Sequence, residues 1–251
     1  MEILASVGIS HIRIPYGHWF FDVSEDEPYP APPQNDDQGL RFYLKRMMGW
    51  ADELDIKVLL DLHGAPGSQN GFDNSGKRGE IHFQDDDKPD RAARVLGQMS
   101  ALMKEWIDQG VMRPETLAGI EFLNEPFGWF EPVWQVVREK FYYDGYEQIR
   151  RVFPDESVPI ALQTGFRAFE EYDEYMQPPV SFYLCFCGLM SVRMFAVCSI
   201  QLLYQSSRKE KFFSENLHAT ISRINATFLR NSLGFTWIFT NTNVLVISGM
   251  V

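Results

Sequence analysis

Apolar residues along this chain follow two spacings, and each spacing predicts a different element. Short continuous apolar runs, typical of strands buried on both faces, lie at 10–14, 56–62, 118–124 and 158–162. Apolar residues three and four positions apart predict helices over 40–54, over 92–106 and broadly over 131–153, and residues 1–7 resemble the end of a helix. Buried strands that alternate with helices are typical of a parallel sheet. The pattern therefore predicts an α/β fold.

Polar residues follow three of these apolar runs. The first run ends in Arg13, the second in His63, and the third in Asn124 and Glu125, where Pro126 closes the strand. Barrel enzymes keep their chemistry at the carboxyl ends of parallel strands. We therefore expect these side chains to lie together, in an arrangement suited to hold a sugar.

A long glycine-rich loop after His63 makes the pattern more specific. It reads Gly-Ala-Pro-Gly-Ser-Gln-Asn-Gly-Phe-Asp-Asn-Ser-Gly over 64–76, and Arg-Ile-Pro stands at 13–15. Together with Asn-Glu-Pro at 124–126, these segments resemble glycoside hydrolase family 5, and within it the fungal-type exo-β-1,3-glucanases. The resemblance covers residues 1 to about 178. It implies a partial TIM (β/α)8 barrel, about strands 2 to 5, that needs no cofactor and acts on β-1,3-glucan polysaccharide or oligosaccharide.

The resemblance also implies roles for the residues at the strand ends. Glu125 matches the catalytic acid/base of a retaining glycosidase, which works with a second carboxylate about 5 to 5.5 Å away. Asn124 matches a donor to the sugar 2-hydroxyl, and His63 matches a residue that lines the sugar site. Arg13 matches an arginine beneath the nucleophile, where positive charge keeps a carboxylate ionised. Without that nucleophile we expect the Arg13 charge to lack its intended partner.

Two loop positions match sugar contacts of the same family. Phe72 occupies the place of an aromatic residue that clamps glucan rings at the cleft entrance, and Asn74 that of a nearby sugar-contacting residue. Trp50, Trp106 and Trp134 lie on helical stripes, so we expect them in the core. The acidic run at 85–87 reads as a solvated loop, and no metal-ligand spacing accompanies it.

The chain changes character near residue 178. Residues 1–178 contain 32 Asp and Glu against 17 Lys and Arg, whereas residues 179–251 contain 2 against 6. The acidic first part argues against nucleic acid as a partner, because phosphate binding draws on clustered Lys and Arg. The sequence therefore predicts a partial barrel over 1–178 and an atypical apolar, basic tail over 179–251 that is not part of it.

The tail does not continue the family pattern. That pattern leads us to expect, in the natural full-length product, a strand ending in His and Tyr and then a strand ending in a nucleophilic Glu. The tail instead offers Glu210 and Glu215, both in polar turn-like surroundings, so no nucleophile is identified. A tail from an altered transcript is the interpretation we favour. A membrane anchor over 182–204 would place Arg193 in the bilayer, at about +3 kcal/mol, and a new packed subdomain is the third alternative.

Two classes of function remain open at this level. The enzyme hypothesis is retaining hydrolysis of β-1,3-glucan, with this chain inactive for lack of the nucleophile. The alternative is a non-catalytic glucan-binding remnant or a product that does not fold, since four strands without closure leave open edges. Residues 1–5 show no basic segment leading into an apolar core, so no signal peptide is recognised. Family members act outside the cell or at its surface, and we expect a missing start.

Overall fold

The computed structural model describes residues 1–30, 36–37, 39–155, 157–168, 171 and 175. Beyond these it gives the backbone of five strands: β5 (Tyr183–Cys187), β6 (Cys198–Leu202), β7 (Thr227–Arg230), β8 (Thr236–Phe239) and β9 (Val244–Ser248).

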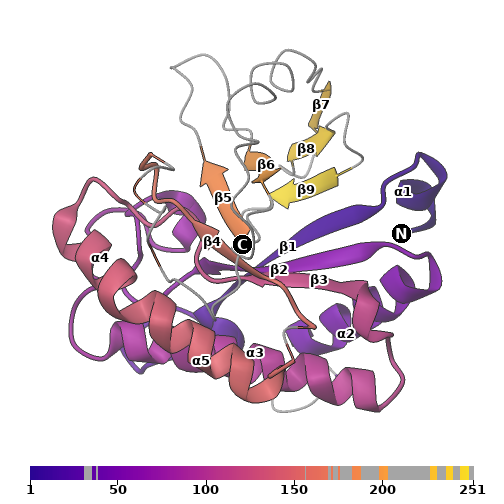
Figure 1. The fold of residues 1–251 in the computed structure, drawn as a ribbon, viewed down its shortest axis with the longest axis horizontal. Helices are drawn as coiled ribbons and strands as arrows, with labels where there is room; N and C mark the ends of the chain where they lie inside the picture. The colour runs from indigo at the N-terminus through magenta and orange to yellow at the C-terminus, as the bar shows by residue number, and fades with distance from the viewer. Residues whose placement is uncertain are drawn as a thin grey trace.

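Four parallel strands form the centre of the molecule, as the apolar runs predict (Figure 1). They are β1 (His11–Gly17), β2 (Lys57–Gly64), β3 (Leu117–Glu121) and β4 (Ile160–Gln163), and they lie side by side in chain order. β1 continues well beyond Arg13, so this arginine lies inside the strand and not at its end. A β-strand alternates its side chains between two faces, and here one face meets the helices while the other faces inward.

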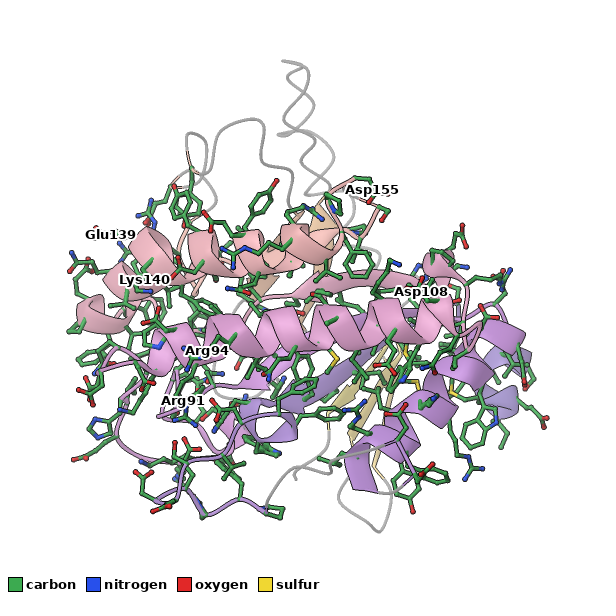
Figure 2. All side chains as sticks on the ribbon, turned by 90° about the horizontal axis from the view of Figure 1, so that it is seen from below. Arg91, Arg94, Asp108, Glu139, Lys140 and Asp155 are labelled. Atoms are coloured by element: carbon green, nitrogen blue, oxygen red, sulfur yellow. The ribbon has the colours of Figure 1, made fainter. Side chains whose placement is uncertain are left out.

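The helices that follow β1 connect the strands and cover one face of the sheet, whereas the short α1 (Glu2–Ser6) precedes β1. The connecting helices are α2 (Gly39–Glu53), α3 (Lys88–Asp108), α4 (Glu131–Val136) and α5 (Tyr142–Val152). A π-helical turn over Val137–Phe141 joins α4 to α5, so the broad helix predicted over 131–153 is interrupted. Short 3-10 turns lie at His18–Phe20, Asp73–Ser75 and Pro114–Thr116. Helices α3 and α5 lie beneath the sheet in Figure 1, and Figure 2, seen from below, shows them side by side in front of it.

The hydrophobic core fills the space between the sheet and these helices. Leu60, Ile120 and Leu162 point from neighbouring strands toward the helices and are fully buried. Trp106 and Trp134 are buried as predicted, at 0% and 2% exposure. The prediction for Trp50 is wrong: it is 42% exposed, and the guanidinium of Arg46 lies 4.6 Å from its ring centroid. Trp50 thus lies at the edge of the apolar stripe of α2, and the Arg46 guanidinium covers one face of its ring.

The opposite face of the same strands is polar. Arg13, Asp61, Glu121 and Gln163 come from β1, β2, β3 and β4 in turn, and all four are buried. Asp61 and Glu121 are direct neighbours in the β2–β3 pairing. The two faces therefore separate packing from chemistry, as in the interior of a barrel enzyme.

The five later strands extend the sheet by backbone pairing. β5 pairs with β4 and β9 with β1, both in parallel, whereas β6, β7 and β8 join by antiparallel pairing. These are short segments, and the separation of 179–251 from the barrel stays a prediction. Most of the span 182–204 lies outside the described residues. Among the helices that the structure does describe, none has the length and apolarity to cross a bilayer.

Candidate active site

Arg13 lies at the centre of a buried network of charged groups. Its Nε and Nη2 donate to the two carboxylate oxygens of Glu121 at 2.7 and 2.8 Å. Nη2 also lies 3.0 Å from Asp61 Oδ2 and donates to Asn124 Oδ1 at 2.9 Å. Gln163 Nε2 donates to the same Glu121 carboxylate. Arg13 is thus paired with the carboxylates of Asp61 and Glu121, which β2 and β3 turn inward beside it, while the expectation that it lacks its intended partner, the nucleophile, stays a prediction.

His63 joins this network through Asp61. Its Nδ1 lies 2.5 Å from Asp61 Oδ2, and its Nε2 lies 3.4 Å from Asn124 Nδ2. A carboxylate that accepts from Nδ1–H leaves Nε2 of the neutral ring as an acceptor facing the Asn124 amide. Asp61 thus holds Arg13 on one side and orients the imidazole on the other.

Glu125 follows β3 and has an unusual backbone. Its φ angle is 46°, in the left-handed region that residues other than glycine rarely adopt. Its Oε2 accepts a hydrogen bond from Asn74 Nδ2 at 3.1 Å. Asn74 comes from the 3-10 turn in the long loop after β2, so this loop reaches across to the end of the neighbouring strand.

Aromatic rings continue from this loop along one side of the site. The ring centroids of Phe72 and Phe127 are 5.9 Å apart, those of Phe127 and Trp129 are 6.2 Å apart, and those of Trp129 and Phe166 are 5.9 Å apart. Trp129 is 58% exposed. Phe72 thus lies at one end of an aromatic row that leads outward, while its role as a sugar clamp stays a prediction.

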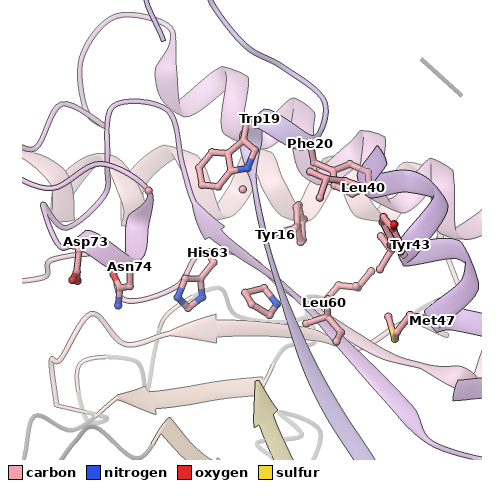
Figure 3. Close-up of a pocket in the computed structure, with 15 residues that line it drawn as sticks. Tyr16, Trp19, Phe20, Leu40, Tyr43, Met47, Leu60, His63, Asp73 and Asn74 are labelled. Carbon is pink, nitrogen blue, oxygen red and sulfur yellow. The ribbon is translucent and has the colours of Figure 1, made fainter. Parts of the chain in front are cut away.

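A cavity of about 290 Å³ adjoins the site. His63, Asp73 and Asn74 form its polar end, and Tyr43 and Met47 of α2 lie at the apolar end (Figure 3). Tyr16 also lines this cavity. Burial raises the pKa of its hydroxyl well above the ordinary value, and the Asp61 charge adds to the effect, so Tyr16 stays protonated.

Trp19 packs where three segments converge. A Cβ atom at Gly17, Gly64 or Gly76 would come within 2.3, 2.7 or 2.5 Å of its indole carbons. Tyr29 stacks on the indole at 4.3 Å between ring centroids with planes 19° apart, and the His18 ring packs edge-on at 5.3 Å. These glycines allow the backbones of β1, β2 and the long loop to close around one indole.

Ion pairs hold the segment after β1 against α3. Arg91 donates to both Glu27 oxygens at 3.1 and 3.0 Å and to Asp22 at 2.9 Å. Burial opposes ionisation of Glu27, but the Arg91 hydrogen bonds outweigh it and lower its pKa. His18 lies 3.2 Å from Glu27 Oε2, yet burial lowers the pKa of its imidazole.

The structure brings together five of the six residues singled out in the sequence. Direct contacts link Arg13 to Asn124, Asn124 to His63, and Asn74 to Glu125. Their roles toward a substrate stay predictions. Sequence reasoning missed Glu121 and Gln163, although the alternation of side chains along β3 and β4 turns both of them toward the inner face of the sheet. Within the described residues no group of three or more His, Cys, Asp and Glu is arranged to hold a metal ion.

This arrangement supports acid–base chemistry on a neutral polar substrate. Glu125 stands at the surface end of a strand, beside amide groups from Asn74 and Asn124 that suit hydroxyl groups. The positive charge of Arg13 lies beneath them, balanced by two buried carboxylates. The aromatic row supplies flat apolar faces that match the C–H surfaces of pyranose rings.

The chain is similar in sequence to curated glucan 1,3-beta-glucosidases. A glucan 1,3-beta-glucosidase of Blumeria graminis is 40% identical over 147 residues, which are 59% of this chain and 31% of the relative. Glucan 1,3-beta-glucosidase 2 of Wickerhamomyces anomalus is 35% identical over 178 residues, 71% of this chain and 38% of the relative. No family model matches. The chain thus spans about a third of the length of these curated relatives.

Solved structures show the same fold. The rutinosidase from Aspergillus niger superposes with a TM-score of 0.53 at 20% sequence identity, covering 68% of this chain and 48% of that one. The crystal structure of AoRut gives a TM-score of 0.55 at 19% identity, with 68% of this chain and 49% of that one covered. The partial barrel predicted from the sequence is confirmed. The chain is a relative of the glucan 1,3-beta-glucosidases and resembles glycoside hydrolase family 5, as its strand-end motifs predict.

Proposed function

We propose that the protein to which these residues belong hydrolyses β-1,3-glucan by a retaining, two-carboxylate mechanism, with Glu125 as the acid/base. The relatives named glucan 1,3-beta-glucosidase support the substrate class. The observation that carries the proposal is the contact between Glu125, which follows β3, and Asn74 from the loop after β2, next to Asn124 and the Arg13 network.

The two steps use Glu125 in opposite senses. In the first step the protonated Glu125 gives its proton to the departing glycosidic oxygen, while a second carboxylate attacks the anomeric carbon. In the second step the ionised Glu125 takes a proton from water, which attacks the glycosyl-enzyme and releases the sugar with retained configuration.

Asn124 is oriented for its part in both steps. The Arg13 guanidinium donates to Asn124 Oδ1, so the amide nitrogen turns toward His63 and the sugar side. An amide fixed in this way donates to the sugar 2-hydroxyl, a contact that strengthens in the oxocarbenium-like transition state. Arg13 thus acts on the substrate through Asn124, in addition to its electrostatic effect.

The second carboxylate is the open part of the proposal. Among the described residues, Asp61 and Glu121 already share Arg13, and Glu121 is also bound by Gln163. Glu210 and Glu215 of the tail lie outside the described residues. We therefore propose that the 251-residue chain alone hydrolyses β-1,3-glucan negligibly, because loss of one of two cooperating carboxylates removes the covalent route.

A non-catalytic glucan-binding protein is the second candidate. The preformed contacts among Arg13, Asn124 and His63 favour it, because these three side chains hold one another in place without a second carboxylate. Laminarin binding by calorimetry, with no release of reducing sugar even by the full-length protein, would favour this candidate. Turnover near that of the full-length relatives would instead overturn the proposal of negligible activity.

Glu125→Gln tests the acid/base role wherever turnover is measurable. Loss of the acid should slow laminarin hydrolysis by about 10²–10⁴-fold, while the first step on dinitrophenyl β-glucoside is spared because this leaving group needs little protonation. Added azide should then restore turnover as β-glucosyl azide. Glu115→Gln, an exposed carboxylate ahead of β3, is the matched control. Equal laminarin activity of wild type and Glu125→Gln would refute the assignment.

A further inference from the structure

Two buried amide side chains of the long loop bind the backbone around Glu125. Gln69 Nε2 donates to the carbonyls of His63 and Asn124, both at 2.8 Å, and Asn70 Nδ2 donates to the carbonyl of Glu125 at 3.1 Å. The main-chain carbonyl of Gln69 also accepts from Phe127 N–H at 3.0 Å. Gln69 is 0% exposed and Asn70 is 2% exposed. The loop therefore holds consecutive backbone groups on both sides of the candidate acid/base.

The orientation of both amides is fixed by further bonds. Gln69 Oε1 accepts from Ala65 N–H at 3.1 Å, which leaves its two N–H groups for the carbonyls at the ends of β2 and β3. Asn70 Oδ1 accepts from Phe72 N–H at 2.9 Å, which turns its nitrogen toward Glu125. Gln69 thus ties the end of β2, which carries His63, to the end of β3, which leads into Glu125.

The backbone they hold is one that the local sequence does not favour. A left-handed conformation is rare for a residue other than glycine, and such strained residues persist where surrounding contacts over-determine them. Pro126 follows directly, and it has no N–H with which to anchor the turn. Contacts from another segment must therefore supply much of the restraint on Glu125.

We propose that Gln69 and Asn70 are positioning residues for the acid/base, which hold Glu125 in its left-handed conformation and aim its carboxylate at Asn74 and the scissile oxygen. This inference rests on the proposed function for its catalytic consequence. A purely structural role for the loop would predict something different: loss of folded protein, with no change in how the remaining molecules treat different substrates.

The variants separate these two roles. Asn70→Ala removes both the contact to Glu125 and the local bond to Phe72, whereas Asn70→Asp keeps an acceptor for Phe72 N–H and loses the donor to Glu125. Gln69→Met keeps the length of the side chain and removes its hydrogen bonds. Ser75→Ala is the matched control, because among the described residues this buried hydroxyl makes its hydrogen bonds within its own loop, at Ser68 Oγ and at the carbonyls of Phe72 and Lys77.

The first measurement needs no turnover. Crystal structures of the 251-residue chain carrying Asn70→Asp and Gln69→Met should show Glu125 outside the left-handed region and its contact with Asn74 broken, while Ser75→Ala keeps both. The proposal is overturned if Glu125 keeps its φ angle and its Asn74 contact in both variants. Asn70→Asp is the milder change, so it serves if Asn70→Ala does not fold.

The second measurement uses the ratio of kcat/KM for phenyl β-glucoside to that for dinitrophenyl β-glucoside, which is independent of the fraction of active molecules. A misplaced acid should lower this ratio by about tenfold or more in Asn70→Ala, and Ser75→Ala should leave it unchanged. An unchanged ratio in Asn70→Ala counts against the proposal. No turnover in the wild-type 251-residue chain is the result that the proposed function expects, and the crystal structures then decide the positioning role by themselves.

Discussion

Replacement of Arg13 by methionine offers the sharpest test of the buried charge network. The change removes a cation that contacts two carboxylates, Asp61 and Glu121, whose side chains are both 0% exposed. Breaking a buried ion pair from one side typically costs 3–5 kcal/mol, because an uncompensated charge is left behind. Gln163 still donates to Glu121 and His63 still contacts Asp61, so we expect a loss near 3 kcal/mol in the free energy of unfolding.

The partner variant should be milder. Glu121→Gln leaves Arg13 paired with Asp61, so its cost should be about 1–3 kcal/mol, the range for a lost hydrogen bond to a charged group. In the double variant the methionine no longer faces the Glu121 charge. Its cost should therefore fall short of the sum of the two single changes by about 1 kcal/mol or more. Urea unfolding followed by circular dichroism measures all three.

The pH dependence of the Arg13→Met variant shows whether its loss of stability comes from the missing charge or from altered packing. In the Arg13→Met variant two neighbouring carboxylates are buried without the cation, and a proton taken up by either one removes an uncompensated charge. Lower pH should therefore relieve part of the cost of the change. The deficit of Arg13→Met relative to wild type should be smaller at pH 5 than at pH 7. Equal single-variant costs, additivity and a deficit independent of pH would together refute the reasoning.

Three further predictions concern stability. Burial lowers the pKa of His18 in the folded state, so the stability that the neutral imidazole contributes is complete above its unfolded pKa of about 6.5 and is lost as pH falls. His18→Gln should therefore reduce the change of the urea midpoint between pH 7 and pH 5. The same pH dependence of the midpoint in wild type and variant would contradict this. Gly71→Ala places a Cβ 2.4 Å from the Gly79 carbonyl, so it should lower the Tm more than Gly110→Ala, which has a similar φ angle and no atom within 4 Å. Trp106→Ala should cost about 3–5 kcal/mol, and Trp50→Ala should cost clearly less in the same denaturation experiment.

Periodicity predicted the central strands and most helices because burial against a common core imposes it along the chain. It did not predict where β1 ends, since Pro15 and Tyr16 continue the strand beyond the polar Arg13. Glu121 was missed because it stands in an apolar run, although the alternation of side chains along β3 turns it toward the inner face of the sheet. The contacts of Gln69 depend on the closure of a loop across two strands, which no local spacing encodes.

Three glycines leave room for the indole of Trp19, and this limits the side chains that these positions accept. One indole ring fills the space left beside Gly17, Gly64 and Gly76, which come from three separate segments of the chain. A side chain added at Gly17 would meet the indole first, so it needs a smaller residue at position 19; at Gly64 the main-chain oxygen of Ser75 is an equally close obstacle, and Gly76 has a φ angle of 81°. We therefore expect Gly17 and Trp19 to change together among relatives and Gly64 and Gly76 to stay glycine, which couples the scaffold strands to the long loop after β2.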